Sequence, residues 1–378
     1  MRKIFFYIHK TGILDYFINP ICKFLTEKYD ITILHLNKRN GFPDKKYDNL
    51  HLIDISDYSS QQIIQLLQEN SPSLFVLPGF ISIYELYMLR MAKMLGIPTL
   101  FLEHGIYSQQ TANIAYNKVL SAQAFHVIHR NLYFLYRYLE LACKSRNWKE
   151  EMTVLYRAIR RKDYSSTQFS RAMFFAPYGY EHINSHFGYK ENQIEYIGYP
   201  LVETNQEYNR IQQLATNNLH NGTAIYIHQP FIKDMLTRWD YNREKEMLTQ
   251  LNNEVKKQGL SLTVSLHPRE SIEHYKRLYS DTDITIKYVD NKEEYAQCSL
   301  AIGHYSTALI YPLFFEKPIW IIDYDTIQSS KESPFSPANT YPLIQVENNR
   351  EFKYNIIGNE VLSFENIAQH IDQYITTL

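Results

Sequence analysis

Polar residues stand at the ends of apolar runs in both halves of the sequence. The stretch FLEHGI contains Glu103 and His104, and the stretch LTVSLHP contains His267. A carboxylate at the end of a buried strand is partly desolvated, which raises its pKa toward the range of a general base. An imidazole can donate a hydrogen bond to a phosphate oxygen or protonate a phosphate as it leaves. These residue types therefore predict transfer chemistry on a phosphate-activated substrate.

Two further stretches in the second half carry groups suited to an anion. IYIHQP ends an apolar run with His228 and Gln229, and GHYSTALIY places Gly303, Ser306 and Thr307 between a predicted strand and a predicted helix. Hydroxyls and backbone amides at a helix N-terminus favour anions. The residues predicted to bind the substrate are His228, Gln229, Pro268, Arg269, Gly303, His304, Ser306 and Thr307.

Each of these residues also has a structural interpretation. Glu103 could pair with a lysine or arginine, His267 could cap a strand-end carbonyl, and Ser306 could serve as a helix N-cap. His104 could replace Glu103 as the base, and the spacing does not separate the two.

The elements that must position these residues follow a strand–helix alternation. Short apolar runs bounded by turn residues alternate with stretches that carry apolar residues every three or four positions. The runs predicted as strands are 3–9, 30–36, 50–56, 73–79, 98–105, 171–177, 194–200, 223–230, 262–268, 284–290, 300–306 and 318–325. Such alternation indicates an α/β fold with mainly parallel sheets, whose strand ends open into a common crevice.

A polar segment near residues 200–222 divides this alternation into two doubly wound, Rossmann-like domains. We predict an acceptor-side domain over 1–210, with a helical insertion at about 110–170, and a nucleotide-donor domain over 211–378. The two domains are expected to face each other across a cleft. The amphipathic stretch 363–378 is expected to form a helix that packs back on the first domain.

Composition indicates which classes of partner the protein binds and in which cellular compartment it is located. The sequence has 39 Lys and Arg and 40 Asp and Glu, a net charge of −1. The protein therefore has no overall positive charge that would attract nucleic acid. Cys22, Cys143 and Cys298 match neither disulfide nor zinc spacing and are expected to be packing residues in a reducing cytosol. The first apolar run is too short for a signal peptide, and no stretch reaches a membrane span. We therefore expect a cytoplasmic protein.

The segment 131–162 is rich in aromatic and basic residues. It could be half core and half solvated surface, or it could line an acceptor groove or contact an anionic membrane. From the last alternative we expect peripheral association with the cytoplasmic face of the inner membrane.

The motifs Glu-His-Gly, Gln-Pro, His-Pro and Ser-Thr resemble, in order and placement, those of the bacterial sialyltransferases and polysialyltransferases of the GT-B fold. The resemblance implies an inverting transfer of an acidic sugar (sialic acid, another nonulosonic acid or Kdo) from a CMP-activated donor. The acceptor would be a glycan or a lipid-linked molecule of surface polysaccharide synthesis. By resemblance Glu103 is the general base, His267 binds the CMP phosphate and assists its departure, and Ser306 and Thr307 hold the phosphate or the cytidine. No metal or other cofactor is implied, and Asp323 with Asp325, the nearest Asp-x-Asp match, is interpreted as a turn.

One departure from this pattern leaves other functions open. The second acidic position of the first motif is His104, and a His-Gly followed by a later His-Pro also resembles the polyol-phosphate transferases that use CDP-glycerol or a relative. The non-hydrolysing UDP-sugar 2-epimerases share the architecture. A nucleotide-binding scaffold of a capsule-export assembly is the non-enzymatic alternative.

Overall fold

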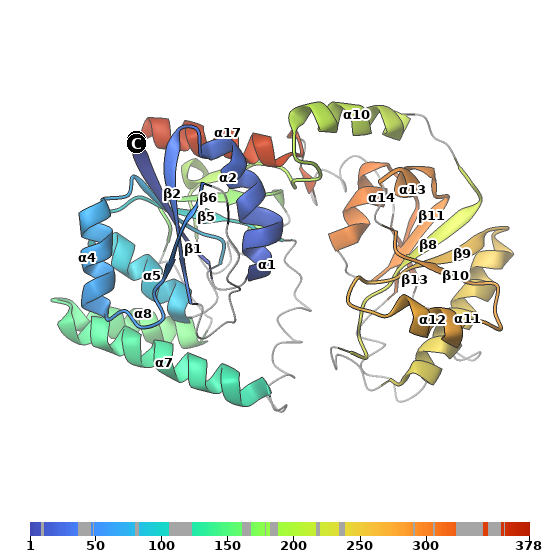
Figure 1. Ribbon diagram of the computed structural model, residues 1–378, viewed down its shortest axis with the longest axis horizontal. Coiled ribbons are helices and arrows are strands. Elements are labelled where there is room, and N and C mark those ends of the chain that lie inside the picture. The colour runs from blue at the N-terminus through green and yellow to red at the C-terminus, as the bar shows by residue number, and fades with distance from the viewer. Residues whose placement is uncertain are drawn as a thin grey trace. The chain divides into compact units, whose positions relative to one another are not determined.

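The chain folds into two compact units, each built around its own sheet (Figure 1). Unit 1 consists of Met1–Tyr208 with Asn355–Leu378, and unit 2 of Asn209–Tyr354. The computed structural model describes residues 1–8, 11–36, 47, 49–79, 83–105, 123–160, 168–177, 179–181, 188–216, 220–233, 239–289, 292–304, 307–322, 343–346, 357–358 and 360–378.

Unit 1 contains a parallel seven-stranded sheet in the order β3-β2-β1-β4-β5-β6-β7. Its strands are β1 (Arg2–Tyr7), β2 (Tyr29–His35), β3 (His51–Asp54), β4 (Leu74–Leu77), β5 (Thr99–Leu102), β6 (Arg171–Phe174) and β7 (Ile194–Tyr196). Its helices are α1 (Thr11–Ile13), the π-helix η1 (Leu14–Ile18), α2 (Asn19–Leu25), α4 (Ser60–Asn70), α5 (Ile83–Met94), α7 (Gln123–Lys144), α8 (Trp148–Arg160), the 3₁₀ helix η4 (Glu191–Gln193) and α17 (Phe364–Thr377). Helix α10 (Asn205–Thr216) spans the boundary between the units.

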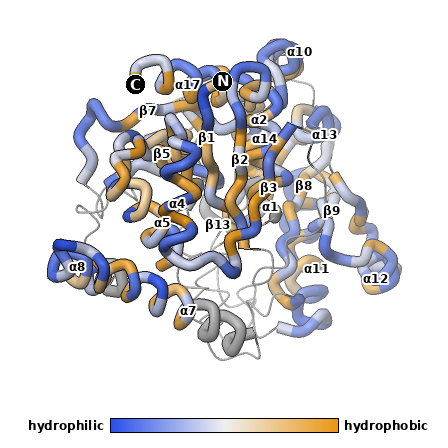
Figure 2. Tube along the Cα trace, turned by 60° about the vertical axis from the view of Figure 1, so that its left-hand side comes forward, coloured by the Kyte–Doolittle hydropathy of each residue, from blue (hydrophilic) through white to orange (hydrophobic). Residues whose placement is uncertain are grey.

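The inner strands of unit 1 are covered on both faces, and successive side chains point to opposite sides of the sheet. In β1, Phe5 and Tyr7 lie in a core shared with α4, α5, α7 and α8. Ile4 and Phe6 lie in the opposite core, shared with η1, α2 and α17. Figure 2 shows the hydrophobic residues that run along β1 and β2. This double burial explains why the strands read as continuous apolar runs.

Unit 2 contains a six-stranded sheet in the order β10-β9-β8-β11-β12-β13, in which β13 alone of the described strands is antiparallel. Its strands are β8 (Thr223–Ile227), β9 (Ser261–Ser265), β10 (Thr285–Lys287), β11 (Leu300–Gly303), β12 (Ile319–Ile322) and β13 (Leu343–Val346). Its helices are α11 (Tyr241–Lys257), α12 (Ile272–Leu278), α13 (Lys292–Gln297), the 3₁₀ helix η5 (Thr307–Leu309) and α14 (Ile310–Phe314). The strand order reverses direction between β8 and β11, which makes that point the topological switch of this sheet.

The last helix, α17, belongs to unit 1, beside α2 (Figure 1). Ile367, Ile371 and Ile375 are fully buried at four-residue spacing, so one face of α17 completes the core. The returning chain passes close to β6, where Gly358 has a φ of 83° and a Cβ on it would lie 2.8 Å from the Phe175 carbonyl oxygen. Only glycine tolerates both the positive φ and the close approach.

These observations confirm the predicted α/β fold with two Rossmann-like sheets. Each run predicted as a strand contains one, and β13 is an additional strand that the sequence analysis did not predict. Cys22 and Cys298 are buried packing residues as expected, whereas for Cys143 the expectation is wrong because its side chain is exposed. Among the described helices, none is both long enough and apolar enough to cross a bilayer.

Candidate active site

Glu103 occupies a buried position directly after β5 in unit 1. Its backbone N–H donates to the Met173 carbonyl at 3.0 Å, which extends the pairing of β5 with β6 by one residue. The side chain is 4% exposed, and its Oε2 accepts a hydrogen bond from the Phe175 N–H at 2.6 Å. Burial raises the pKa of the Glu103 carboxyl to about 8, against the opposing effect of the Phe175 hydrogen bond. The carboxyl is therefore a desolvated acid, as the apolar run before it predicts.

A glycine makes room for the Glu103 carboxylate. A Cβ on Gly179 would overlap Glu103 Oε1. The backbone at position 179 can therefore lie this close to the carboxylate only because glycine has no side chain. The alternative in which Glu103 pairs with a lysine or arginine finds no support within the described residues. His104, the next residue, has an exposed side chain.

A second buried carboxylate in unit 1 was not among the predicted site residues. Glu85 on α5 is 4% exposed, and a Cβ on Gly79, two residues after β4, would overlap its Oε1. The sequence gives a weak signal for this arrangement, a Pro-Gly turn after an apolar run followed by a glutamate in the next helix.

In unit 2 the predicted residues follow three neighbouring strands at the same edge of the sheet. His267 follows β9, His228 and Gln229 follow β8, and Gly303 ends β11 with His304 after it. Strand β8 pairs in parallel with both β9 and β11, so the carboxyl ends of all three lie side by side. The edge includes the topological switch point, where doubly wound sheets bind their ligands.

His267 has the geometry of a hydrogen-bond donor. Its Nδ1 accepts the Arg269 N–H at 3.2 Å, so the neutral ring carries its proton on Nε2. The Glu270 N–H donates to the His267 carbonyl at 2.9 Å and closes the turn that contains Pro268. His267 is half-buried, whereas Pro268 and Arg269 are exposed. An Nε2–H at a strand end can donate to a phosphate oxygen.

His228, in contrast, points into unit 2. Its side chain is fully buried, and Nε2 lies 2.9 Å from Glu244 Oε1 on α11 and 3.1 Å from the Tyr275 hydroxyl on α12. The Tyr275 hydroxyl donates to Glu244 Oε2 at 2.8 Å, so the three groups form a closed network. Nδ1 of His228 is buried and has no hydrogen-bond partner among the described residues. Glu244 and Tyr275 were missed by the sequence analysis, because nothing in the sequence links them to His228.

His304 is also buried at this edge. Its Nε2 lies 2.9 Å from the Tyr226 hydroxyl, and the Phe231 ring packs against it with 4.7 Å between centroids. Burial, followed by the nearby His228, lowers the pKa of His304 to about 3, so this imidazole is neutral at physiological pH. Gly303 is buried and Gln229 is half-buried.

The side chains of the remaining predicted residues are outside the part of the chain that the structure describes. Ser306 is outside the described residues, and Thr307 begins η5 with a side chain that is likewise outside them. Asp323 and Asp325 are also outside. Within the described ranges no three His, Cys, Asp or Glu side chains converge on a point that could hold a metal ion. The expectation of a metal-independent reaction stays a prediction.

Comparison with known proteins yields structural similarity only. No protein-family model and no curated protein sequence matches the chain. The UDP-GlcNAc 2-epimerase from Methanocaldococcus jannaschii is 15% identical with a TM-score of 0.47, over 98% of this chain and 99% of its own. The wall teichoic acid polymerase TagF is 14% identical with a TM-score of 0.48, over 100% of this chain and 89% of its own. The glycosyltransferase of kitacinnamycin is 10% identical with a TM-score of 0.49, over 99% of both chains. Similarities of this degree carry no argument about activity.

Proposed function

We propose that the protein is an inverting, metal-independent glycosyltransferase that moves an acidic sugar from a CMP-activated donor to a glycan or lipid-linked acceptor. The observation that carries the proposal is the grouping of His267, Gln229 and Gly303 at three adjacent strand ends beside the topological switch of unit 2. Doubly wound sheets bind nucleotides at this place. The half-buried imidazole of His267 supplies a phosphate donor there, and the order of the four motifs supports a cytidine nucleotide.

In the proposed reaction Glu103 acts on the attacking hydroxyl, and His267 acts on the leaving phosphate. Glu103 accepts the proton of the acceptor hydroxyl while the oxygen of that hydroxyl forms a bond to the anomeric carbon. The bond from that carbon to the CMP phosphate oxygen breaks, and the electron pair stays on the phosphate. His267 Nε2–H stabilises the departing charge. A carboxyl with a pKa of about 8 suits this role, because a base works best when its pKa lies near the operating pH.

Cytidine nucleotides test the donor site directly. We expect CMP and CDP, but not UMP or UDP, to raise the melting temperature of the protein. The variant His267→Ala should lose most of this stabilisation, while His274→Ala, a histidine of α12 in the same unit, should keep it. Failure of any cytidine nucleotide to stabilise the wild-type protein would contradict the proposed donor.

A second candidate is a polyol-phosphate transferase that uses CDP-glycerol or a relative. It is favoured by one observation: His104 is exposed, whereas the neighbouring Glu103 is buried and already accepts the Phe175 N–H. An exposed imidazole is the more accessible base. Product formation from CMP-sugars and from CDP-glycerol, each with Glu103→Gln and His104→Gln, separates the candidates. Conversion of a UDP-sugar without an acceptor would instead identify an epimerase.

The proposed acceptor also predicts where in the cell the enzyme is located. A glycan or lipid-linked acceptor of surface polysaccharide synthesis would place the enzyme in the cytoplasm, at the inner face of the membrane. Cell fractionation with antibody detection tests this location, and recovery of the protein in the periplasm would contradict it.

A further inference from the structure

Helix α8 of unit 1 exposes three large apolar side chains along one side. Trp148, Met152 and Tyr156 are 55%, 38% and 55% exposed, and their four-residue spacing places them in one row. On α7, Leu132 and Tyr136 are exposed at the same spacing. Half of the large apolar side chains exposed in the described residues thus lie in this pair of helices. Such a concentration marks an interaction surface rather than scattered surface residues.

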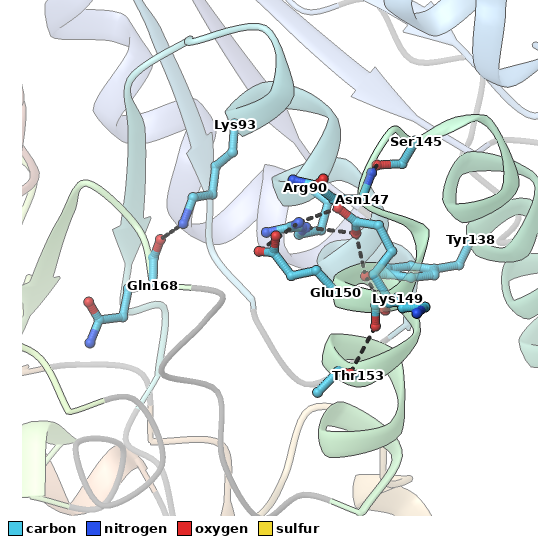
Figure 3. Close-up of polar contacts among 10 residues, drawn as sticks. Arg90, Lys93, Tyr138, Ser145, Asn147, Lys149, Glu150, Thr153 and Gln168 are labelled. Carbon is cyan, nitrogen blue, oxygen red and sulfur yellow. Dashed lines mark hydrogen bonds and ion pairs between the residues drawn. The ribbon is translucent and has the colours of Figure 1, made fainter.

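Buried contacts on another side of α8 fix the helix in this rotation, and Figure 3 shows their partners Arg90 and Tyr138. Glu151 is buried and accepts two hydrogen bonds from the Arg90 guanidinium on α5, that from Nε at 2.9 Å. The Tyr138 hydroxyl of α7 donates to the same carboxylate at 3.1 Å. Val154 and Leu155 are buried beside Glu151. Rotating α8 to hide the row Trp148–Met152–Tyr156 would expose these residues and break a buried ion pair, which is strongly destabilising.

Positive charge accompanies the apolar row. Positions 149, 153 and 157 form the neighbouring row of the helix, and two of them are the exposed basic residues Lys149 and Arg157. The turn before α8 adds the exposed side chains of Lys144 and Arg146.

The carboxylates of α7 and α8 are engaged by basic groups. Glu140 pairs with Arg137 at 3.1 Å and with Lys144 at 2.7 Å. Glu150 lies 3.7 Å from the same Arg90 guanidinium that binds Glu151. The outer side of α8 therefore combines an apolar row with a positive one.

We propose that the outer side of α8 docks on an anionic lipid bilayer. Trp148, Met152 and Tyr156 would enter the headgroup region, and Lys149 and Arg157 would lie at the lipid phosphates. Aromatic side chains favour this depth of the bilayer, and a basic row beside an apolar one is the pattern of interfacial helices. The adjoining positive row favours a lipid surface over an apolar protein partner. The inference does not rest on the proposed donor, and it adds the surface that would bring a lipid-linked acceptor within reach.

Tryptophan fluorescence reports the docking of this helix directly. The chain has three tryptophans, and Trp239 and Trp320 pack against the core of unit 2, so Trp148 is the one exposed in α8. Adding phosphatidylcholine vesicles that contain phosphatidylglycerol should shift the emission to shorter wavelength at low salt. Phosphatidylcholine alone should not produce the shift, and neither should anionic vesicles with a Trp148→Phe variant.

Co-sedimentation with the same vesicles tests the residues. The triple variant Trp148→Ala, Met152→Ala, Tyr156→Ala should bind at least tenfold more weakly, whereas Tyr16→Ala, which removes an 82% exposed tyrosine elsewhere in unit 1, should bind like wild type. Lys149→Gln and Arg157→Gln should each weaken binding about fivefold, equivalent to ~1 kcal/mol per basic residue at an anionic surface. Lys256→Gln and Lys257→Gln on α11 are the matched charge controls.

Three results would overturn the inference. The first is wild-type protein that fails to bind the anionic vesicles at low salt, and the second is a triple variant that binds as well as wild type. The third is a triple variant that changes only the sedimentation coefficient in the absence of lipid, in which case the surface joins two copies of the chain. Transfer to a short soluble acceptor should be equal in wild type and the triple variant. Loss of vesicle binding with unchanged transfer therefore separates this inference from the proposed function.

Discussion

Glu103 should make the stability of unit 1 depend on pH, and the variant Glu103→Gln should remove this dependence. The folded protein holds the Glu103 pKa at about 8, above the ordinary value of 4.5. Because the folded state keeps the proton that the unfolded state loses, the stabilisation is complete below about pH 4.5 and is lost as the pH rises to 8. Glutamine is neutral throughout and can still accept the Phe175 N–H.

The size of the effect follows from the distance between the two pKa values. At about 1.4 kcal/mol per pKa unit, the interval from 4.5 to 8 corresponds to ~5 kcal/mol at most. A unit of this size changes its melting temperature by roughly 2–4 °C per kcal/mol, so we expect a difference of roughly 10–20 °C at most. Wild type and Glu103→Gln should melt together near pH 5, and the variant should melt higher above pH 8.

Thermal unfolding followed by circular dichroism across this pH range measures the difference between the two proteins. Glu27→Gln changes an exposed glutamate of the same unit and should follow the wild-type curve at every pH. Parallel curves for wild type and Glu103→Gln would refute the reasoning, because they would mean that folding does not change the protonation of Glu103. If Glu103 is also the base, kcat/KM of the wild type should rise with pH toward about 8.

Other substitutions test single contacts of unit 1. Gly179→Ala places a methyl group on the Glu103 carboxylate, so we expect a lower melting temperature at acid pH and a flatter pH dependence in the same measurement. Arg90→Met leaves the buried Glu151 without its guanidinium and should destabilise by about 3–5 kcal/mol in urea unfolding. Adding Glu151→Met should recover most of that loss, and no recovery would mean that the pair is not the cause. Ile371→Ala in α17 should destabilise by ~2–5 kcal/mol, and a change under 1 kcal/mol would contradict its full burial.

The fold was predictable because the sheets are buried on both faces. A parallel strand covered by helices on both sides is apolar at most positions, and such a run is visible without knowledge of its neighbours. Strand β13 (Leu343–Val346) was missed for the opposite reason. It is four residues long, follows a long segment without strand–helix alternation, and pairs antiparallel with β12 at the end of the sheet.

The sequence predicted that the candidate residues lie at strand ends, but it did not predict the direction in which their side chains point. The ends of parallel strands meet at one edge, so the placement of His228 and His267 followed from the strands alone. The burial of His228 depends on Glu244 and Tyr275, which α11 and α12 bring to it from 16 and 47 residues away in the chain. The apolar run before Glu103 predicts a desolvated carboxyl, whereas the role of Gly179 as its neighbour requires the fold.

The return of α17 to unit 1 has a consequence for biosynthesis. Arg2 Nη1 of β1 donates to the Ile375 carbonyl at 2.7 Å, and Lys28 pairs with Asp372 at 2.7 Å, so helix α17 joins elements that are translated well before it. On the ribosome, unit 2 emerges in full before the residues of α17 do. Unit 1 is begun before unit 2 and completed after it, and until then Ile4 and Phe6 lack part of their apolar cover. The nascent chain therefore carries an open hydrophobic face for the whole time that unit 2 is being made, a state that favours engagement by chaperones.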